Sequence, residues 1–204
     1  IPEISSWAMG LNIVFSLLFF VFLYKFVPLA ITTQLQSYTS WLDGNLGFTL
    51  MDGTLRLVIF VTFLAAVSRM KDIRRVFEYH GAEHKVVFNY ESGLPLNVSN
   101  SQSFRTFHPR CGTSFLMVVM LTSIVVYALI PAEGFALKFL VRVSLLPVIA
   151  GVSYEIIRFA AKRQGTLWSW MVNPGLWLQR ITTKNPNDEQ VKISIQSLKT
   201  AMVL

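Results

Sequence analysis

The sequence has little charge and a single cysteine, and each shortage excludes a class of protein. Charged residues make up 14% of the 204 residues, whereas 53% are hydrophobic, a balance too apolar for an ordinary soluble domain. One cysteine excludes a disulfide within the chain. Acidic residues are also scarce, with 11 Asp and Glu against 18 Lys and Arg. We therefore expect a basic membrane protein that owes none of its stability to internal disulfides.

The apolar residues are gathered in four stretches that are long enough, or nearly so, to cross a bilayer. They cover residues 8–31, 47–67, 114–131 and 136–157. Charges in the second and fourth stretches are costly inside a bilayer and usually face protein or water. Asp52 and Arg56 lie four residues apart in the second stretch, a spacing that predicts a structural ion pair on one helix face. The predicted fold class is an all-α integral membrane protein with about four transmembrane helices.

The first stretch is too long for the core of a signal peptide, so we expect a true span. The chain begins with Ile-Pro-Glu and has no initiator methionine, and we expect the natural start to lie elsewhere.

Basic residues are concentrated in two places, which predicts the orientation in the membrane. Seven of them lie between Arg69 and Cys111, and seven more follow residue 157. Because Lys and Arg mark the cytoplasmic side, we expect this loop, the tail and both termini on the cytoplasmic, or stromal, side. The chain would then divide into spans one and two (1–68), a cytoplasmic loop (69–113), spans three and four (114–157) and an interfacial and cytoplasmic tail (158–204).

The net charge of +7 raises the question of partners. Topology accounts for where the charge lies, and attraction to anionic lipid headgroups is a second explanation. The expected partners are the lipid bilayer and a larger membrane protein complex. No nucleic acid partner is expected.

The loop is expected to contain a helix with two histidines on its apolar face. Between residues 70 and 90 the apolar side chains recur every three or four positions, and His80 and His84 lie on the same stripe. These imidazoles should face packed side chains. A similar pattern over residues 187–204 predicts an amphipathic helix with Asn187 or Asp188 as its N-cap. Before it, Trp168, Trp170 and Trp177 predict a segment lying in the membrane interface.

The segment His80-Gly-Ala-Glu-His84 predicts a site for a divalent metal, with zinc as the preferred ion. Histidines at i and i+4 of a helix can bind one Zn²⁺, and Glu83 beside the second can act as a general base on a water that the zinc activates. The order H-x-x-E-H is that of inverzincin proteases. Two buried, hydrogen-bonded imidazoles that stabilise the loop are the structural alternative.

Three further residues are candidate metal ligands. His108 and Cys111 have the two-residue gap that is common in zinc loops. Glu155 follows His84 by 71 residues in the fourth apolar stretch, where an ion pair with Arg158 would explain it equally well. If the second span continued as a straight helix, His80 would lie roughly 17 Å beyond Arg69. Either the helix bends along the interface or Glu155 is not a ligand.

Four blocks of the sequence resemble the YqhQ-like family of bacterial membrane proteins, which has relatives in plastid-bearing organisms. They run from Tyr79 to Lys85, His108 to Phe115, Gly151 to Glu155 and Pro174 to Arg180, and the resemblance extends from about Met51 to the C-terminus. It implies a bacterial inner membrane or a plastid membrane and a metal-dependent enzyme, without naming a substrate. The candidate residues that match these blocks are His80, Glu83, His84, His108, Cys111 and Glu155.

Two hypotheses of function follow. In the first, the protein is a metal-dependent hydrolase acting at the cytoplasmic membrane interface on a peptide or a lipid-linked group, with Glu83 as the general base. In the second, it is a non-catalytic scaffold or assembly factor whose metal or histidine cluster stabilises the loop while the chain docks a larger membrane complex. Haem ligation and transport are weaker alternatives, because the sequence has no haem pocket pattern and no broken helix at mid-membrane.

Overall fold

The computed structural model describes residues 5–109, 111–162 and 173–203, and these residues form helices and no β-strand. The predicted helical class is therefore confirmed for them. The chain divides into two compact units, the first made of Ile1–Phe60 with Val119–Val152 and the second of Val61–Val118 with Ser153–Leu204.

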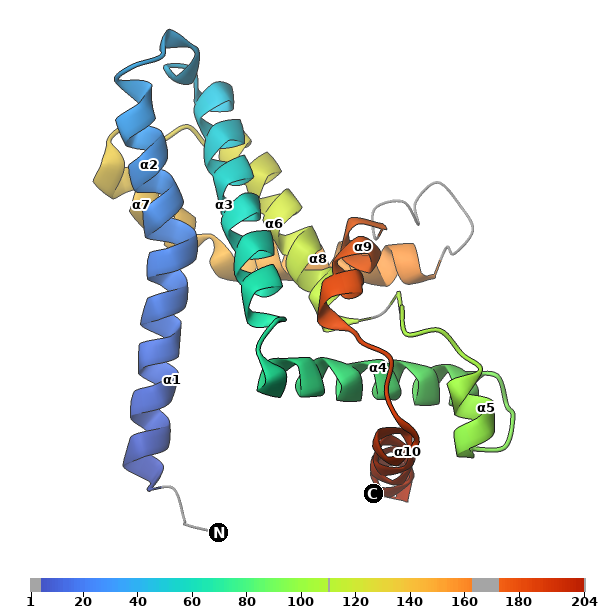
Figure 1. Ribbon diagram of the computed structural model, residues 1–204. Helices are drawn as coiled ribbons and strands as arrows, with labels where there is room; N and C mark the ends of the chain where they lie inside the picture. The colour runs from blue at the N-terminus through green and yellow to red at the C-terminus, as the bar shows by residue number, and fades with distance from the viewer. Residues whose placement is uncertain (1–4, 110, 163–172, 204) are drawn as a thin grey trace. The chain divides into compact units, whose positions relative to one another are not determined.

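Three helical segments of the described chain are long and apolar enough to cross a membrane. They are Trp7–Gln36, Asn45–Val67 (α3) and Gly112–Leu129 (α6). The first is drawn as the long blue helix of Figure 1 and consists of α1 (Ser6–Val21), a π-helical turn (Phe22–Phe26, η1) and α2 (Val27–Gln36). Pro28 lies in the first turn of α2, where it has no backbone N–H to donate to the preceding turn.

The fourth apolar stretch is not one straight helix, which corrects the continuous span expected over residues 136–157. It forms α7 (Phe135–Ser144) and α8 (Leu146–Ala161), bent by 47° at the break between them. Pro147 follows this break and cannot donate a hydrogen bond to the last turn of α7. The pair counts as a fourth span only if both helices are taken together.

Helix α3 and the short 3-10 turn before it, η2 (Ser40–Leu42), belong mainly to the first unit. Gly53 allows α3 to approach α6 closely, because a Cβ atom there would lie 2.4 Å from the side chain of Ile124. Phe48 and Leu29 are buried in this unit. The predicted ion pair between Asp52 and Arg56 is confirmed.

The second unit is built around α4 (Lys71–Glu91), which confirms the helix expected over residues 70–90. Met70 has an extended backbone, so α4 begins as a new helix and does not continue α3. Helices α5 (Val98–Gln102) and α10 (Asp188–Val203) both pack on α4 (Figure 1). The core of this contact consists of Ala82, Val86, Val191 and Ile195.

The tail contains α9 (Asn173–Thr182) and α10. Asn187 caps α10 by accepting a hydrogen bond from the backbone N–H of Gln190, whose side chain accepts one from the N–H of Asn187. This reciprocal pair is a capping box and confirms Asn187 as the N-cap. Trp177 is exposed on α9, whereas the predicted interfacial residues Trp168 and Trp170 lie outside the described residues.

Candidate metal centre

Helix α4 places His80 and His84 on one face, one turn apart. Their ring centroids are 4.4 Å apart. Gly81 lies between them, and a Cβ atom at this position would lie 2.0 Å from the carbonyl oxygen of Lys184. Lys184 also donates its backbone N–H to the carbonyl of Phe77 at 2.9 Å. The absence of a side chain at Gly81 thus lets the segment after α9 lie directly on the histidine-bearing helix.

Cys111 is brought to the same histidines by the segment that leads into α6. Its Sγ lies 3.1 Å from His80 Nε2. One potential ligand atom from each of His80, His84 and Cys111 lies within 4.8 Å of the other two. A metal ion needs several histidine, cysteine or carboxylate ligand atoms close together. Among the described residues, these three side chains are the ones that meet this condition.

Both imidazoles are oriented by backbone carbonyls. His80 Nδ1 lies 2.8 Å from the carbonyl oxygen of Thr182, and His84 Nδ1 is hydrogen-bonded to the carbonyl of Thr106. A carbonyl can only accept, so each Nδ1 carries a proton and each Nε2 is the ring nitrogen that remains for another partner. Nε2 can donate to the Cys111 sulfur while it is protonated, and it can bind a metal once it has lost that proton. Histidines that bind metals are held in this way by a second hydrogen bond. The three side chains therefore fit a zinc ion in both donor type and orientation.

The electrostatics of the cluster favour a thiolate at Cys111. Burial would raise the pKa of this thiol, but hydrogen bonds from His80, His84 and Thr113 outweigh that effect and lower the pKa to about 5. The hydrogen bond to Cys111 in turn raises the pKa of His80, against the effect of burial. The thiolate is the form of cysteine that binds metals and attacks electrophiles, so Cys111 can act as a metal ligand or as a nucleophile.

The other predicted ligands lie outside this group. The ring of His108 packs against that of Phe88 at a tilt of 47°, with centroids 4.5 Å apart, and its Nε2 lies 3.6 Å from a carboxylate oxygen of Glu91. Glu155 has a side chain that is 65% exposed and lies 3.5 Å from Arg158. The ion pair that the sequence offered as an alternative for Glu155 is thus present, and the carboxylate is not grouped with the histidines.

Glu83, the expected general base, is exposed on α4 next to the cluster. Its negative charge contributes to the raised pKa of His80. The carboxylate is therefore close enough to act electrostatically on the site, while its exposure leaves it open to solvent and to a substrate.

Gln179 is a supporting residue that the sequence did not indicate. Its fully buried amide donates to the carbonyl of His108 at 2.8 Å and to Ser114 Oγ at 2.9 Å, and its oxygen accepts the backbone N–H of His108 at 2.8 Å. These bonds fix the segment that presents Cys111. Gln179 lies in one of the blocks that carry the family resemblance, but a glutamine in an amphipathic helix has no spacing signal of its own. The carbonyls of Thr106 and Thr182 have no signal in the sequence either.

Comparison with known proteins gives one family and one relative. A family model described as a protein of unknown function, DUF1385, matches residues 2–203. The chain is 35% identical over 192 residues to a Bacillus subtilis (strain 168) protein described as uncharacterized protein YqhQ, a match that covers 94% of this chain and 59% of that protein. The chain thus spans less than two thirds of its relative's length. No solved structure matches. The similarity begins well before Met51, where the sequence blocks had placed its limit.

Proposed function

The chain belongs to DUF1385, a family of proteins of unknown function, and we propose that it is a zinc-dependent hydrolase of the membrane interface. The observation that carries the proposal is the group formed by His80, His84 and Cys111, in which two imidazoles bonded to carbonyls through Nδ1 face one thiolate. Three protein ligands leave one position of a tetrahedral zinc site open, as in catalytic zinc sites. A zinc ion there would act as a Lewis acid and lower the pKa of water.

In this proposal Glu83 is the general base. It is exposed, stands on the same helix as both histidines and acts on His80 through its charge. A carboxylate in this place can accept the proton of the attacking water and later donate it to the leaving group. His108, held between Phe88 and Glu91, packs beside the site and is not assigned as a ligand.

The proposed substrate is a lipid-linked group with negative charge. A pocket of about 560 Å³ in the second unit is lined by four basic residues, namely Arg69, Arg74, Arg180 and Lys184. Ile181 and Lys184 line it, and the carbonyl of Thr182 between them is the one that orients His80. Basic pockets at the cytoplasmic ends of spans favour anionic headgroups. The apolar helices support a membrane protein, and in this proposal it lies in a bacterial inner membrane or a plastid membrane, with this unit on the cytoplasmic or stromal side.

The alternative function is a scaffold or assembly factor in which the metal is structural. It is favoured by the burial of His84 and Cys111, which are 7% and 8% exposed, and by the thiolate ligand, since cysteine is common in closed structural zinc sites. In this case the metal would join α4 to the segment before α6, and the protein would dock a larger membrane complex.

Substitution of Glu83 distinguishes the two functions. Glu83→Gln removes the base and leaves all three ligands in place, so a hydrolase should keep its zinc and lose its ability to complement a deletion strain. Glu189→Gln, an exposed acidic residue in the first turn of α10, is the matched control. If Glu83→Gln keeps its zinc and complements fully, the hydrolase proposal is contradicted and the scaffold is the function that remains.

A further inference from the structure

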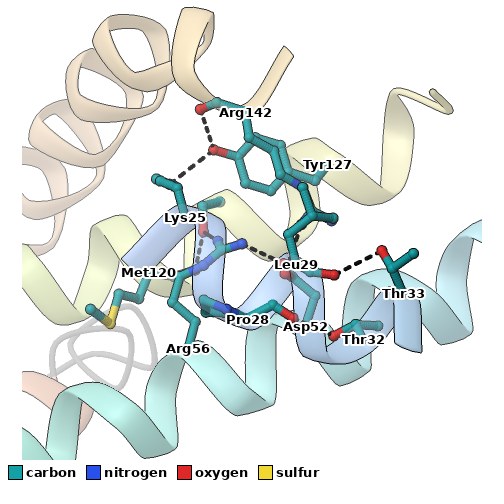
Figure 2. A network of polar contacts seen from close by, with 11 residues as sticks. Lys25, Pro28, Leu29, Thr32, Thr33, Asp52, Arg56, Met120, Tyr127 and Arg142 are labelled. Carbon is teal, nitrogen blue, oxygen red and sulfur yellow. Dashed lines mark hydrogen bonds and ion pairs between the residues drawn. The ribbon is translucent and has the colours of Figure 1, made fainter. Parts of the chain in front are cut away.

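The first unit buries more positive charge than negative charge. Lys25, Arg56 and Arg142 are each no more than 4% exposed, and Asp52 is the buried carboxylate among the described residues of this unit. These residues come from η1, α3 and α7 and meet around Tyr127 of α6 (Figure 2). The two arginines alone exceed the single buried carboxylate by one positive charge in a region of apolar helices, and Lys25 lies beside them.

The carboxylate is shared by the two arginines. Asp52 is paired with Arg56, and its Oδ1 lies 2.7 Å from Arg142 Nη1. Arg56 also donates to Ser123 Oγ at 2.9 Å. One carboxylate can cancel only one of these two positive charges. The arginine pair therefore keeps a net charge of +1.

Lys25 has a neutral partner. Its ammonium donates to Tyr127 Oη at 3.1 Å, and the tyrosine hydroxyl donates onward to the carbonyl of Arg142 at 2.9 Å. The ring of Tyr127 also lies 5.3–5.4 Å from the charged groups of Lys25, Arg56 and Arg142. Cation–π contacts attract these groups, but the ring has no net charge to neutralise them.

A small cavity lies beside this excess of charge. Its volume of about 10 Å³ measures the space open to the centre of a water-sized sphere, and a cavity of this size holds about one such particle. Two basic residues, Lys138 and Arg142, contribute to its wall together with the polar residues Asn45, Thr49 and Tyr127. Asn45 and Thr49 belong to the first turns of α3, and the N-terminal end of a helix attracts negative charge.

We propose that this cavity binds a small inorganic anion of the size of chloride, held by Arg142 and Lys138. The anion neutralises part of the charge excess, which a water molecule in the same place could not do, since buried ions are costly unless they are paired. The size of the cavity selects a monatomic anion over a tetrahedral oxyanion. This site is independent of the proposed zinc site, which lies in the other unit.

Thermal unfolding of the detergent-purified protein tests the proposal. The midpoint is measured while chloride replaces gluconate at constant ionic strength, so that general screening is unchanged. We expect a saturable rise of several degrees with chloride and with bromide, and none with sulfate. The rise should be lost in Lys138→Gln and in Arg142→Gln, whereas Lys199→Gln, an exposed residue of α10, should keep it.

Lys138→Gln decides the outcome if Arg142→Gln does not fold. Lys138 is half-buried and lies over the ring of Phe48 at 3.5 Å, whereas Asp52 forms its ion pairs with Arg56 and Arg142. Equal midpoints in chloride and gluconate would overturn the proposal. A chloride effect of full size in Lys138→Gln would overturn the assigned position, and stabilisation by sulfate equal to that by chloride would overturn the assigned size.

Discussion

His80 Nε2 lies 3.1 Å from Cys111 Sγ, although 31 residues separate them in the sequence. The contact joins α4 to the segment before α6 and turns a local pair of histidines into a group of three potential ligands. The zinc proposal depends on this contact, because two histidines alone fall short of the three protein ligands of a catalytic zinc site.

The thiol of Cys111 should react unusually fast at low pH in the metal-free protein. With a pKa of about 5, it is almost fully thiolate from pH 6 to 8, whereas an ordinary thiol with a pKa of about 8.5 gains reactivity about tenfold per pH unit in this range. The rate of labelling by a small alkylating reagent should therefore change little between pH 6 and 8. It should be much lower after zinc is added.

His80→Ala is the matching variant for this measurement. It removes the hydrogen bond that lowers the pKa of Cys111 most. The pKa of the thiol should therefore rise, and the rate of labelling should become strongly dependent on pH. A flat profile in His80→Ala, or a steep one in the unmodified protein, would show that the histidine does not control the thiol.

Gln179→Ala should weaken zinc binding although Gln179 is no ligand. It removes three buried hydrogen bonds that fix the segment around His108 and Ser114, and each buried polar group left without a partner costs about 1–3 kcal/mol. We expect a lower midpoint of thermal unfolding and a higher Kd for zinc. Gln196→Ala, an exposed position on α10, should change neither quantity. Unchanged zinc affinity in Gln179→Ala would show that Gln179 does not position the zinc ligands.

Gly81→Ala should be destabilising even though alanine favours helices. The added Cβ would lie 2.0 Å from the carbonyl oxygen of Lys184, and overpacking of this kind costs about 1–3 kcal/mol. Gly151→Ala in α8 is the matched control, since its Cβ would meet no atom within 4 Å, and it should stabilise by up to about 1 kcal/mol. Thermal unfolding of both variants measures the difference. Equal midpoints would contradict the close contact between the tail and α4.

Asp52→Asn should be among the most destabilising single changes in the first unit. It removes the carboxylate that pairs with Arg56 and Arg142, and breaking a buried ion pair from one side costs about 3–5 kcal/mol. The midpoint of thermal unfolding should fall sharply, while Asp43→Asn, at an exposed position, should leave it unchanged. A fall in Asp52→Asn no larger than in this control would show that the pairs contribute little.

Local spacing predicted one pair of residues in the candidate metal centre and one pair among the buried ion pairs, because each pair lies on a single helix. His80 with His84, and Asp52 with Arg56, are each four residues apart, so helical geometry alone brings them together. Spacing could not select Cys111 over His108 as the third member of the group, because that choice depends on how the loop folds back on α4.

The partners from distant segments could not be read from the sequence. Arg142 reaches Asp52 across 90 residues, and Lys25 reaches Tyr127 across 102, while a single cation in an apolar stretch predicts burial without naming its partner. The bend between α7 and α8 had a visible signal in Pro147, but the hydropathy of residues 136–157 is continuous across it. Hydropathy measures whether a segment can enter a membrane and does not measure whether it is straight.

The metal content of the detergent-purified protein tests the central claim most directly. Elemental analysis should find close to one zinc per chain in the unmodified protein and none in the double variant His80→Ala/His84→Ala, which loses both imidazole ligands of the proposed site. Zinc retained by the double variant would place the metal elsewhere. A protein without zinc, prepared with zinc present throughout, would contradict the metal centre and with it the hydrolase.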